Sequence, residues 1–178
     1  MRVSQFAVSS IGRDRPGIVA AIAAALLGID ANVEDSRMAI LGGHFAVMLI
    51  VSTPEGCDRE AVEAALTEAR EDLGLEALTV SEVRPADAGR APDHVITVYG
   101  SDHPGIVHAI SAELASSGVN ITDLQTRVGG APEAPIYVML LEVDLGETDG
   151  DDLRRQLGEV AAGAGVEVEL RPLDSEAL

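Results

Sequence analysis

The chain has 178 residues and a net charge of −18, from 30 acidic and 12 basic residues. Such an acidic surface repels the phosphate backbone of nucleic acids, so we expect no direct binding to DNA or RNA. The single cysteine, Cys57, excludes an internal disulfide framework. No apolar stretch has the length of a signal peptide or a membrane span, which favours a cytoplasmic protein without membrane contact.

The first half of the chain predicts the order strand, helix, strand, strand, helix, strand. Apolar residues alternate, or recur at helical spacing, in strand 3–11, helix 16–28, strand 32–40, strand 45–51, helix 58–73 and strand 77–84. Gly42 and Gly43 predict a hairpin turn between the second and third strands. Asp58, or a neighbour, is the expected cap of the second helix.

The same pattern returns 88 positions later. The octapeptide from Gly12 to Val19 recurs from Gly100 to Val107. The second copy predicts strand 94–99, helix 104–117, strand 120–128, strand 136–143, helix 149–162 and strand 166–171. Its hairpin connection, residues 129–135, contains two prolines and is predicted to be a longer, stiffer loop than that of the first copy.

The order βαββαβ favours a four-stranded antiparallel sheet with two helices on one face, which is the ferredoxin-like α+β fold. We place the first domain at 1–85, a polar linker at 86–93, the second domain at 94–173 and an acidic tail at 174–178. Each sheet should keep an open edge strand, so we also expect a homo-oligomer.

Each copy has a glycine- and proline-containing turn between its first strand and first helix. Gly12 and Gly100 end the strands, where glycine permits a positive φ or a close approach. Pro16 and Pro104 are predicted to be the first helical residues, because that position needs no N–H partner. The first turn of each helix then presents N–H groups that suit a carboxylate.

The motif Asp-x-Pro-Gly-Ile-Val after a glycine-ended strand, followed by Asn-x-x-Asp at the second strand, resembles the ACT domain. This domain is a small-molecule-sensing module of amino-acid metabolism, and both halves of the chain match it. A tandem pair without a catalytic domain is similar to transcriptional regulators of the glycine cleavage system. The resemblance implies a non-enzymatic regulator that binds a small amino acid of the glycine or serine class at a domain seam and modulates a protein partner.

A zwitterionic amino acid needs an anion-binding and a cation-binding element close together. Main-chain N–H groups at the helix start would hold the carboxylate. Asn and Asp oxygens of the second strand would hold the ammonium group, because we expect that strand to begin beside the first helix turn. The candidate ligand-binding residues are Gly12, Asp14, Gly17, Ile18, Asn32 and Asp35, and in the second copy Gly100, Asp102, Gly105, Ile106, Asn120 and Asp123.

Structural explanations compete with several of these roles. Asp14 and Asp102 could simply cap the helices, and Asn32 and Asn120 could hold turns. The second copy replaces Ser36-Arg37-Met38 by Leu124-Gln125-Thr126, which leaves open whether both copies bind the same ligand.

No group of residues predicts catalysis, a cofactor or a metal site. His103 and His108 are five positions apart, not the four that bring two imidazoles to one metal, so we expect solvent-facing side chains. The acidic run from Glu147 to Asp152 lacks the ligand spacing of a calcium loop. The alternative to a sensor is a regulatory subunit of a metabolic enzyme that binds its partner without sensing a ligand.

Overall fold

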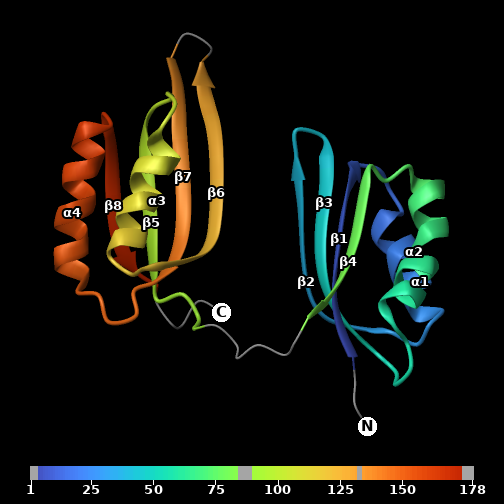
Figure 1. Cartoon of the computed structure of the whole chain (residues 1–178). Coiled ribbons are helices and arrows are strands. Elements are labelled where there is room, and N and C mark those ends of the chain that lie inside the picture. Colours follow the sequence, from blue (N-terminus) through green and yellow to red (C-terminus); the bar gives the residue numbers. More distant parts are fainter. Residues whose placement is uncertain (1–3, 84–89, 132–133, 174–178) are drawn as a thin grey trace. The chain divides into compact units, whose positions relative to one another are not determined.

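The computed structural model describes residues 4–83, 90–131 and 134–173. The chain forms two compact units, Met1–Asp87 and Ala88–Leu178. Each unit is a four-stranded antiparallel sheet with both helices on one face (Figure 1). The predicted βαββαβ order is therefore confirmed in both halves. Residues 86–89 of the predicted linker and the predicted tail, 174–178, lie outside the described residues.

The first unit has the sheet order β2-β3-β1-β4. Its elements are β1 (Ser4–Arg13), α1 (Ile18–Leu27), β2 (Asn32–Leu41), β3 (His44–Thr53), α2 (Arg59–Leu73) and β4 (Ala77–Val83). A β-bulge interrupts the pairing of β2 with β3 between Val33 and Asp35. Asp58 caps α2 as predicted, because its carboxylate accepts from the N–H of Ala61 at 2.9 Å.

The second unit repeats this arrangement in the order β6-β7-β5-β8. Its elements are β5 (His94–Ser101), α3 (Ile106–Ser116), β6 (Asn120–Ala131), β7 (Ala134–Asp144), α4 (Gly150–Gly163) and β8 (Val166–Pro172). The bulge also recurs, between Ile121 and Asp123. Asp93, the last residue of the predicted linker, is tied to this unit through its N–H to Val143 and its carbonyl to Leu173.

Each core lies between the helical face of the sheet and its two helices. The inward residues of α1 are Ile18, Ile22 and Leu26, at the spacing of one helix face. The inward residues of β3 alternate, as a half-buried strand requires. Full burial of one such side chain stabilises the fold by about 1.5–3 kcal/mol. No helix in the described ranges is both long and apolar enough to span a membrane.

The prediction that Pro16 and Pro104 begin the helices is wrong. Helix α1 begins at Ile18 and α3 at Ile106, each one residue after a glycine with a left-handed backbone. That glycine turns the chain sharply between strand and helix, so the proline lies in the turn before it. The fixed φ of proline suits this turn position as well as it suits a first helical residue.

The prediction of a longer hairpin loop in the second copy is also wrong. The ladder between β6 and β7 continues through Gly129–Ile136, Gly130–Pro135 and Ala131–Ala134. The insertion therefore lengthens the strands rather than the loop. On the other side of β7, the pairing with β5 ends at Ile136. Pro135 is therefore not paired with β5, and its missing N–H costs no hydrogen bond to that strand.

Candidate functional site

Each strand-to-helix turn contains a glycine whose backbone has a left-handed conformation, which other residues adopt only with strain. Gly17 has φ 97° and ψ −11°, and Gly105 has φ 103° and ψ −12°. No side chain caps either helix start, so the explanation of Asp14 and Asp102 as caps is wrong. The first intrahelical bonds run from Ala21 and Ala109 back to these glycines at 2.9 Å, and the preceding N–H groups have no helical acceptor.

Gly12 and Gly100 have a packing explanation of their own. A Cβ on Gly100 would lie 2.9 Å from Cγ1 and 3.0 Å from Cα of Val166. A Cβ on Gly12 would lie 3.1 Å from Cδ2 of Leu75. The close approach expected at these two glycines is therefore to residues just before, or at the start of, the last strand of each unit. Ligand contacts by these two glycines stay a prediction.

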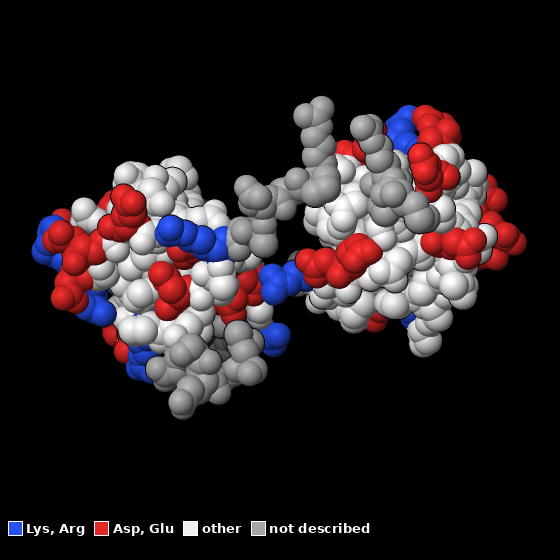
Figure 2. Space-filling model, turned by 90° about the horizontal axis from the view of Figure 1, so that it is seen from below, with Lys and Arg blue, Asp and Glu red and all other residues white. Residues whose placement is uncertain are grey.

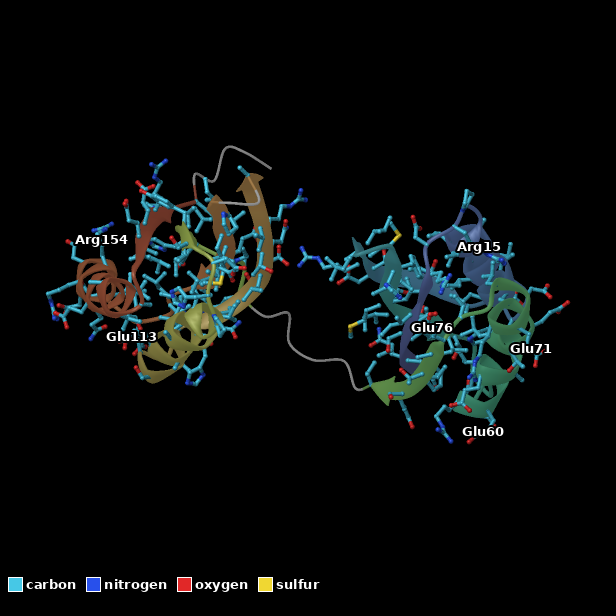
Figure 3. All side chains as sticks on the ribbon, turned by 90° about the horizontal axis from the view of Figure 1, so that it is seen from above. Arg15, Glu60, Glu71, Glu76, Glu113 and Arg154 are labelled. Atoms are coloured by element: carbon cyan, nitrogen blue, oxygen red, sulfur yellow. The ribbon has the colours of Figure 1, made fainter. Side chains whose placement is uncertain are left out.

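A basic side chain links each turn to the end of the second helix of its unit. In the first unit, Nη2 of Arg15 (labelled in Figure 3) donates to the carbonyl of Asp72 at 2.6 Å. In the second, Nε2 of His103 lies 2.6 Å from the carbonyl oxygen of Ala164, and Nδ1 lies 3.0 Å from that of Pro104. His103 is exposed, as expected, but both ring nitrogens are engaged.

These contacts raise the pKa of His103 above its usual value of 6.5. The hydrogen bond to the carbonyl of Pro104 is the largest cause, and the bond to the carbonyl of Ala164 is the next. Only the protonated ring has an N–H on both nitrogens, so these two acceptors together favour the protonated form. The carboxylate of Asp102 adds a smaller attraction.

A pocket of about 450 Å³ surrounds the start of α3. Its lining residues are His103, Pro104, Gly105, Ile106, Val107, His108 and Tyr137. Tyr137 pairs with Gly100, as Phe45 pairs with Gly12, so the two aromatic residues occupy matched positions. The Tyr137 side chain is buried, and its hydroxyl donates to Sδ of Met139 at 3.7 Å. Burial raises the pKa of this phenol.

The expectation that the second strand begins beside the first helix turn is wrong. Arg13 pairs with His44 at one end of β3, whereas Asn32 pairs with Ser52 at the other. Helix α1, of ten residues, returns the chain by about 15 Å before β2 starts. Asn120 pairs with Asp144 in the same way. Within one unit, the helix-start candidates and the second-strand candidates therefore lie at opposite ends of the sheet.

Asn32 takes part in a polar network at the β2 bulge instead of holding a turn. Its Nδ2 donates to Oε1 of Glu34 at 3.0 Å, and the hydroxyl of Ser52 donates to the same oxygen at 2.5 Å. The Ser52 bond, and next the Asn32 bond, lower the pKa of Glu34 below its usual 4.5. Asp35 accepts from the N–H of Ser36 at 2.7 Å. The sequence reasoning missed Glu34, because a bulge has no signature in the strand alternation.

The second unit has different chemistry at the matched bulge. Thr122 occupies the place of Glu34, and its hydroxyl donates to the carbonyl of Glu142 at 3.1 Å. Oδ2 of Asp123 accepts from Nε2 of Gln125 at 3.1 Å. The two candidate ammonium sites are therefore not equivalent.

Acidic side chains are prominent on the face shown in Figure 2, with a few arginines between them. Within residues 4–83, 90–131 and 134–173 no three His, Cys, Asp or Glu side chains gather as metal ligands would. The uncapped helix starts offer main-chain N–H groups that suit an anion.

Comparisons with known proteins agree with the fold. Models of the ACT domain match residues 4–79 and 94–161. The crystal structure of an unknown protein from Galdieria sulphuraria covers 97% of this chain and 100% of its own, with 32% identity and a TM-score of 0.82. The structure of a putative glycine cleavage system transcriptional repressor covers 98% and 100%, with 18% identity and a TM-score of 0.77, and shows likeness of fold.

Two curated relatives have names that refer to function. A phosphoserine phosphatase of Streptomyces coelicolor is 29% identical over 167 residues, which are 90% of this chain and 38% of the phosphatase. The glycine cleavage system transcriptional repressor of Escherichia coli is 28% identical over 124 residues, which are 67% of this chain and 63% of the repressor. The chain thus spans less than two thirds of the length of either relative. On the two domain matches and the fold, it belongs to the ACT-domain family and carries the domain in tandem.

Proposed function

We propose that the chain is a non-enzymatic regulator that binds a small amino acid of the glycine or serine class and thereby changes its affinity for a protein partner. The observation that carries this proposal is the uncapped start of α1 and of α3, each formed by a left-handed glycine. Such a helix start offers N–H groups and the positive end of the helix dipole to a carboxylate. Coupling between ligand and partner is typically about 1–3 kcal/mol.

The proposed site takes its two halves from two different domains. Within one domain, Gly17 and Asn32 lie at opposite ends of the sheet, too far apart for one small amino acid. A ligand held by its carboxylate at the helix start of one domain would therefore meet an ammonium-binding oxygen, such as that of Asp35 or Asp123, from another domain. The domain seam expected from the sequence therefore stays part of the proposal.

The partner is expected to carry any effect on transcription. With a net charge of −18 the chain repels DNA, so regulation of glycine or one-carbon metabolism would pass through a DNA-binding protein. The similarity to the repressor of Escherichia coli supports this pathway. A cytoplasmic location and a homo-oligomer remain part of the proposal, and the exposed edge strand β2 supports the latter.

A second candidate is a regulatory subunit of a metabolic enzyme that senses no ligand. The match of 90% of this chain to part of a phosphoserine phosphatase favours it. This candidate predicts a partner that binds equally well with and without amino acids.

Isothermal titration calorimetry of the purified chain against glycine, serine and the branched-chain amino acids tests the proposal. We expect saturable binding that Val19→Asp and Val107→Asp together abolish. Both valines are exposed in the first turn of their helices, where an added carboxylate stabilises the helix but repels that of the ligand. Val19→Asn and Val107→Asn are the uncharged controls and should keep binding.

Two outcomes would contradict the proposal. Flat traces for every amino acid would favour the ligand-independent subunit, and a pull-down with and without amino acids would then test it. Binding that survives both aspartate substitutions together would move the ligand away from the helix starts. Asn32→Ala then tests the second half of the site, with Ser52→Ala as the control that removes only the other bond to Glu34.

A further inference from the structure

We propose that His103 is a proton-operated brace that holds the β5–α3 turn against the end of α4, a device for which the first domain has a permanent equivalent. The imidazole contacts two carbonyl oxygens at once. Nδ1 lies 3.0 Å from that of Pro104 in the turn, and Nε2 lies 2.6 Å from that of Ala164.

A neutral imidazole carries one N–H and one lone pair. It can satisfy one of these carbonyls, and the other then faces an unprotonated nitrogen. The imidazolium ion donates to both. Ala164 is the C-terminal cap of α4, and the negative end of the helix dipole favours a cation there. Protonation therefore strengthens the link, because the ring then donates to both carbonyls, and loss of the proton leaves it with one bond.

One neighbouring charge acts in the same direction, and desolvation of the ring acts against it. Asp102, in the same turn, attracts the protonated ring. His108 of α3 and Tyr137 of β7 line the same pocket. The last turn of α4 carries no basic residue that would oppose the imidazolium. The brace is thus strongest while the ring is protonated, and it weakens as the pH rises through the raised pKa of the ring.

Arg15 occupies the matched position of the first domain, 88 residues earlier. Its Nη2 donates to the carbonyl of Asp72, in the last turn of α2, at 2.6 Å. A guanidinium ion stays charged throughout the physiological range. The same connection between turn and helix end is therefore independent of pH in the first domain and dependent on it in the second.

Opening of the brace releases the turn that contains Gly105 and Ile106. These residues carry candidate carboxylate-binding N–H groups, and the departing proton also removes a positive charge beside them. Affinity of the second domain for an amino acid should fall as the pH rises. This regulatory role rests on the proposed function, whereas the brace itself does not.

Hydrogen exchange of the full chain between pH 6 and pH 9 tests the brace. After correction for intrinsic exchange, the opening constant of peptide 101–109 should rise by up to about tenfold per pH unit between the pKa values of the braced and the open ring. Peptide 13–21 should show no such rise. His103→Arg should flatten the response, Arg15→His should confer it on the first domain, and His108→Ala should leave it unchanged.

A flat response of peptide 101–109 in the unmodified chain, or a response that persists in His103→Arg, would overturn the brace. Proton NMR of the four histidines is the check that needs no variant of the turn. A titration of His103 below 6.5 would contradict the brace as well.

Calorimetry with glycine and serine at pH 6 and pH 8.5 tests the regulatory role. We expect weaker binding at pH 8.5 in the unmodified chain and equal binding in His103→Arg. Equal binding at both pH values in the unmodified chain would refute regulation through His103. Absence of binding at either pH, together with pH-dependent exchange of the turn, would refute the proposed function and leave the brace standing.

Discussion

The two domains have the same backbone at their strand-to-helix turns but different side chains around them. Gly17 and Gly105 agree to within a few degrees in φ and ψ. Beside the turns, His103 replaces Arg15 and Tyr137 replaces Phe45. At the bulge, which lies at the other end of each sheet, Thr122 replaces Glu34. Backbone geometry thus repeats in this chain where the fold requires it, and the chemistry beside it is free to diverge.

This difference gives the candidate sites of the two copies different chemistry. The first domain has a permanent cation at its turn and a carboxylate network at its bulge. The second has a titratable cation and a buried hydroxyl at the pocket around α3. The chain therefore carries two related candidate sites, and they are not equivalent.

Alanine at Gly12 and at Gly100 should destabilise the two domains by the most unequal amounts. Gly100→Ala places Cβ against the backbone and side chain of Val166, at 3.0 and 2.9 Å, and overpacking of this kind costs about 1–3 kcal/mol. Gly12→Ala should cost less, because the nearest atom is the movable end of Leu75, at 3.1 Å, and the Leu75 backbone is farther away, at 3.3 Å. Urea-dependent hydrogen exchange, read separately for each domain, measures both. Equal losses would show that the start of β8 at Val166 yields as easily as Leu75.

Alanine at the two turn glycines should instead destabilise both domains by similar amounts. Gly17→Ala and Gly105→Ala each force a left-handed backbone on a residue with a side chain, at a cost of about 1–2 kcal/mol. Gly158→Ala in α4 is the control. It has open space and no positive φ, so it should stabilise its domain by about 0.5–1 kcal/mol. A clear difference between the two turn variants in the same exchange experiment would show that the turns are not equally constrained.

A buried hydroxyl without a partner distinguishes the first core from the second. Thr53 is 2% exposed, and its Oγ1 has no hydrogen-bond partner in the described part of the chain. The matched residue of the second domain is the apolar Leu145. Thr53→Val should raise the free energy of unfolding of the first domain by about 1 kcal/mol. Ser10→Ala, which removes a buried hydroxyl that donates to Ala77 at 3.2 Å, should lower it. A loss in both variants would mean that Thr53 has a partner after all.

The fold could be predicted from the sequence because its signals are local and written twice. Alternation in strands such as β3 and helical spacing in α1 follow from burial of one face. The repeat then identified the second domain. Errors arose where two conformations suit the same residue, as with Pro16, or where pairing of distant residues decides the outcome, as with Pro135.

The candidate site could be predicted only in part. The glycine turns were found because their sequence is unusual. The position of Asn32 was misjudged, because a helix between two strands carries the chain back to the other end of the sheet. His103 and Glu34 acquire their partners from residues 61 and 18 positions away, and neither pairing has a local signal.

The smallest expected difference between the two domains is in their response to acid, at the bulges of β2 and β6. The bonds from Ser52 and Asn32 lower the pKa of Glu34 in the folded state below its usual 4.5. A group with a lowered folded pKa contributes stability that is present above its unfolded pKa and lost as the pH falls through the folded value. Exchange of peptides from β2 should therefore accelerate, beyond the intrinsic rate, below about pH 4.5. Peptides from β6, with Thr122 at the matched bulge, should not show this component. Glu34→Gln should remove it from β2, and a component that persists in that variant would assign it to another carboxylate of the strand, such as Asp35.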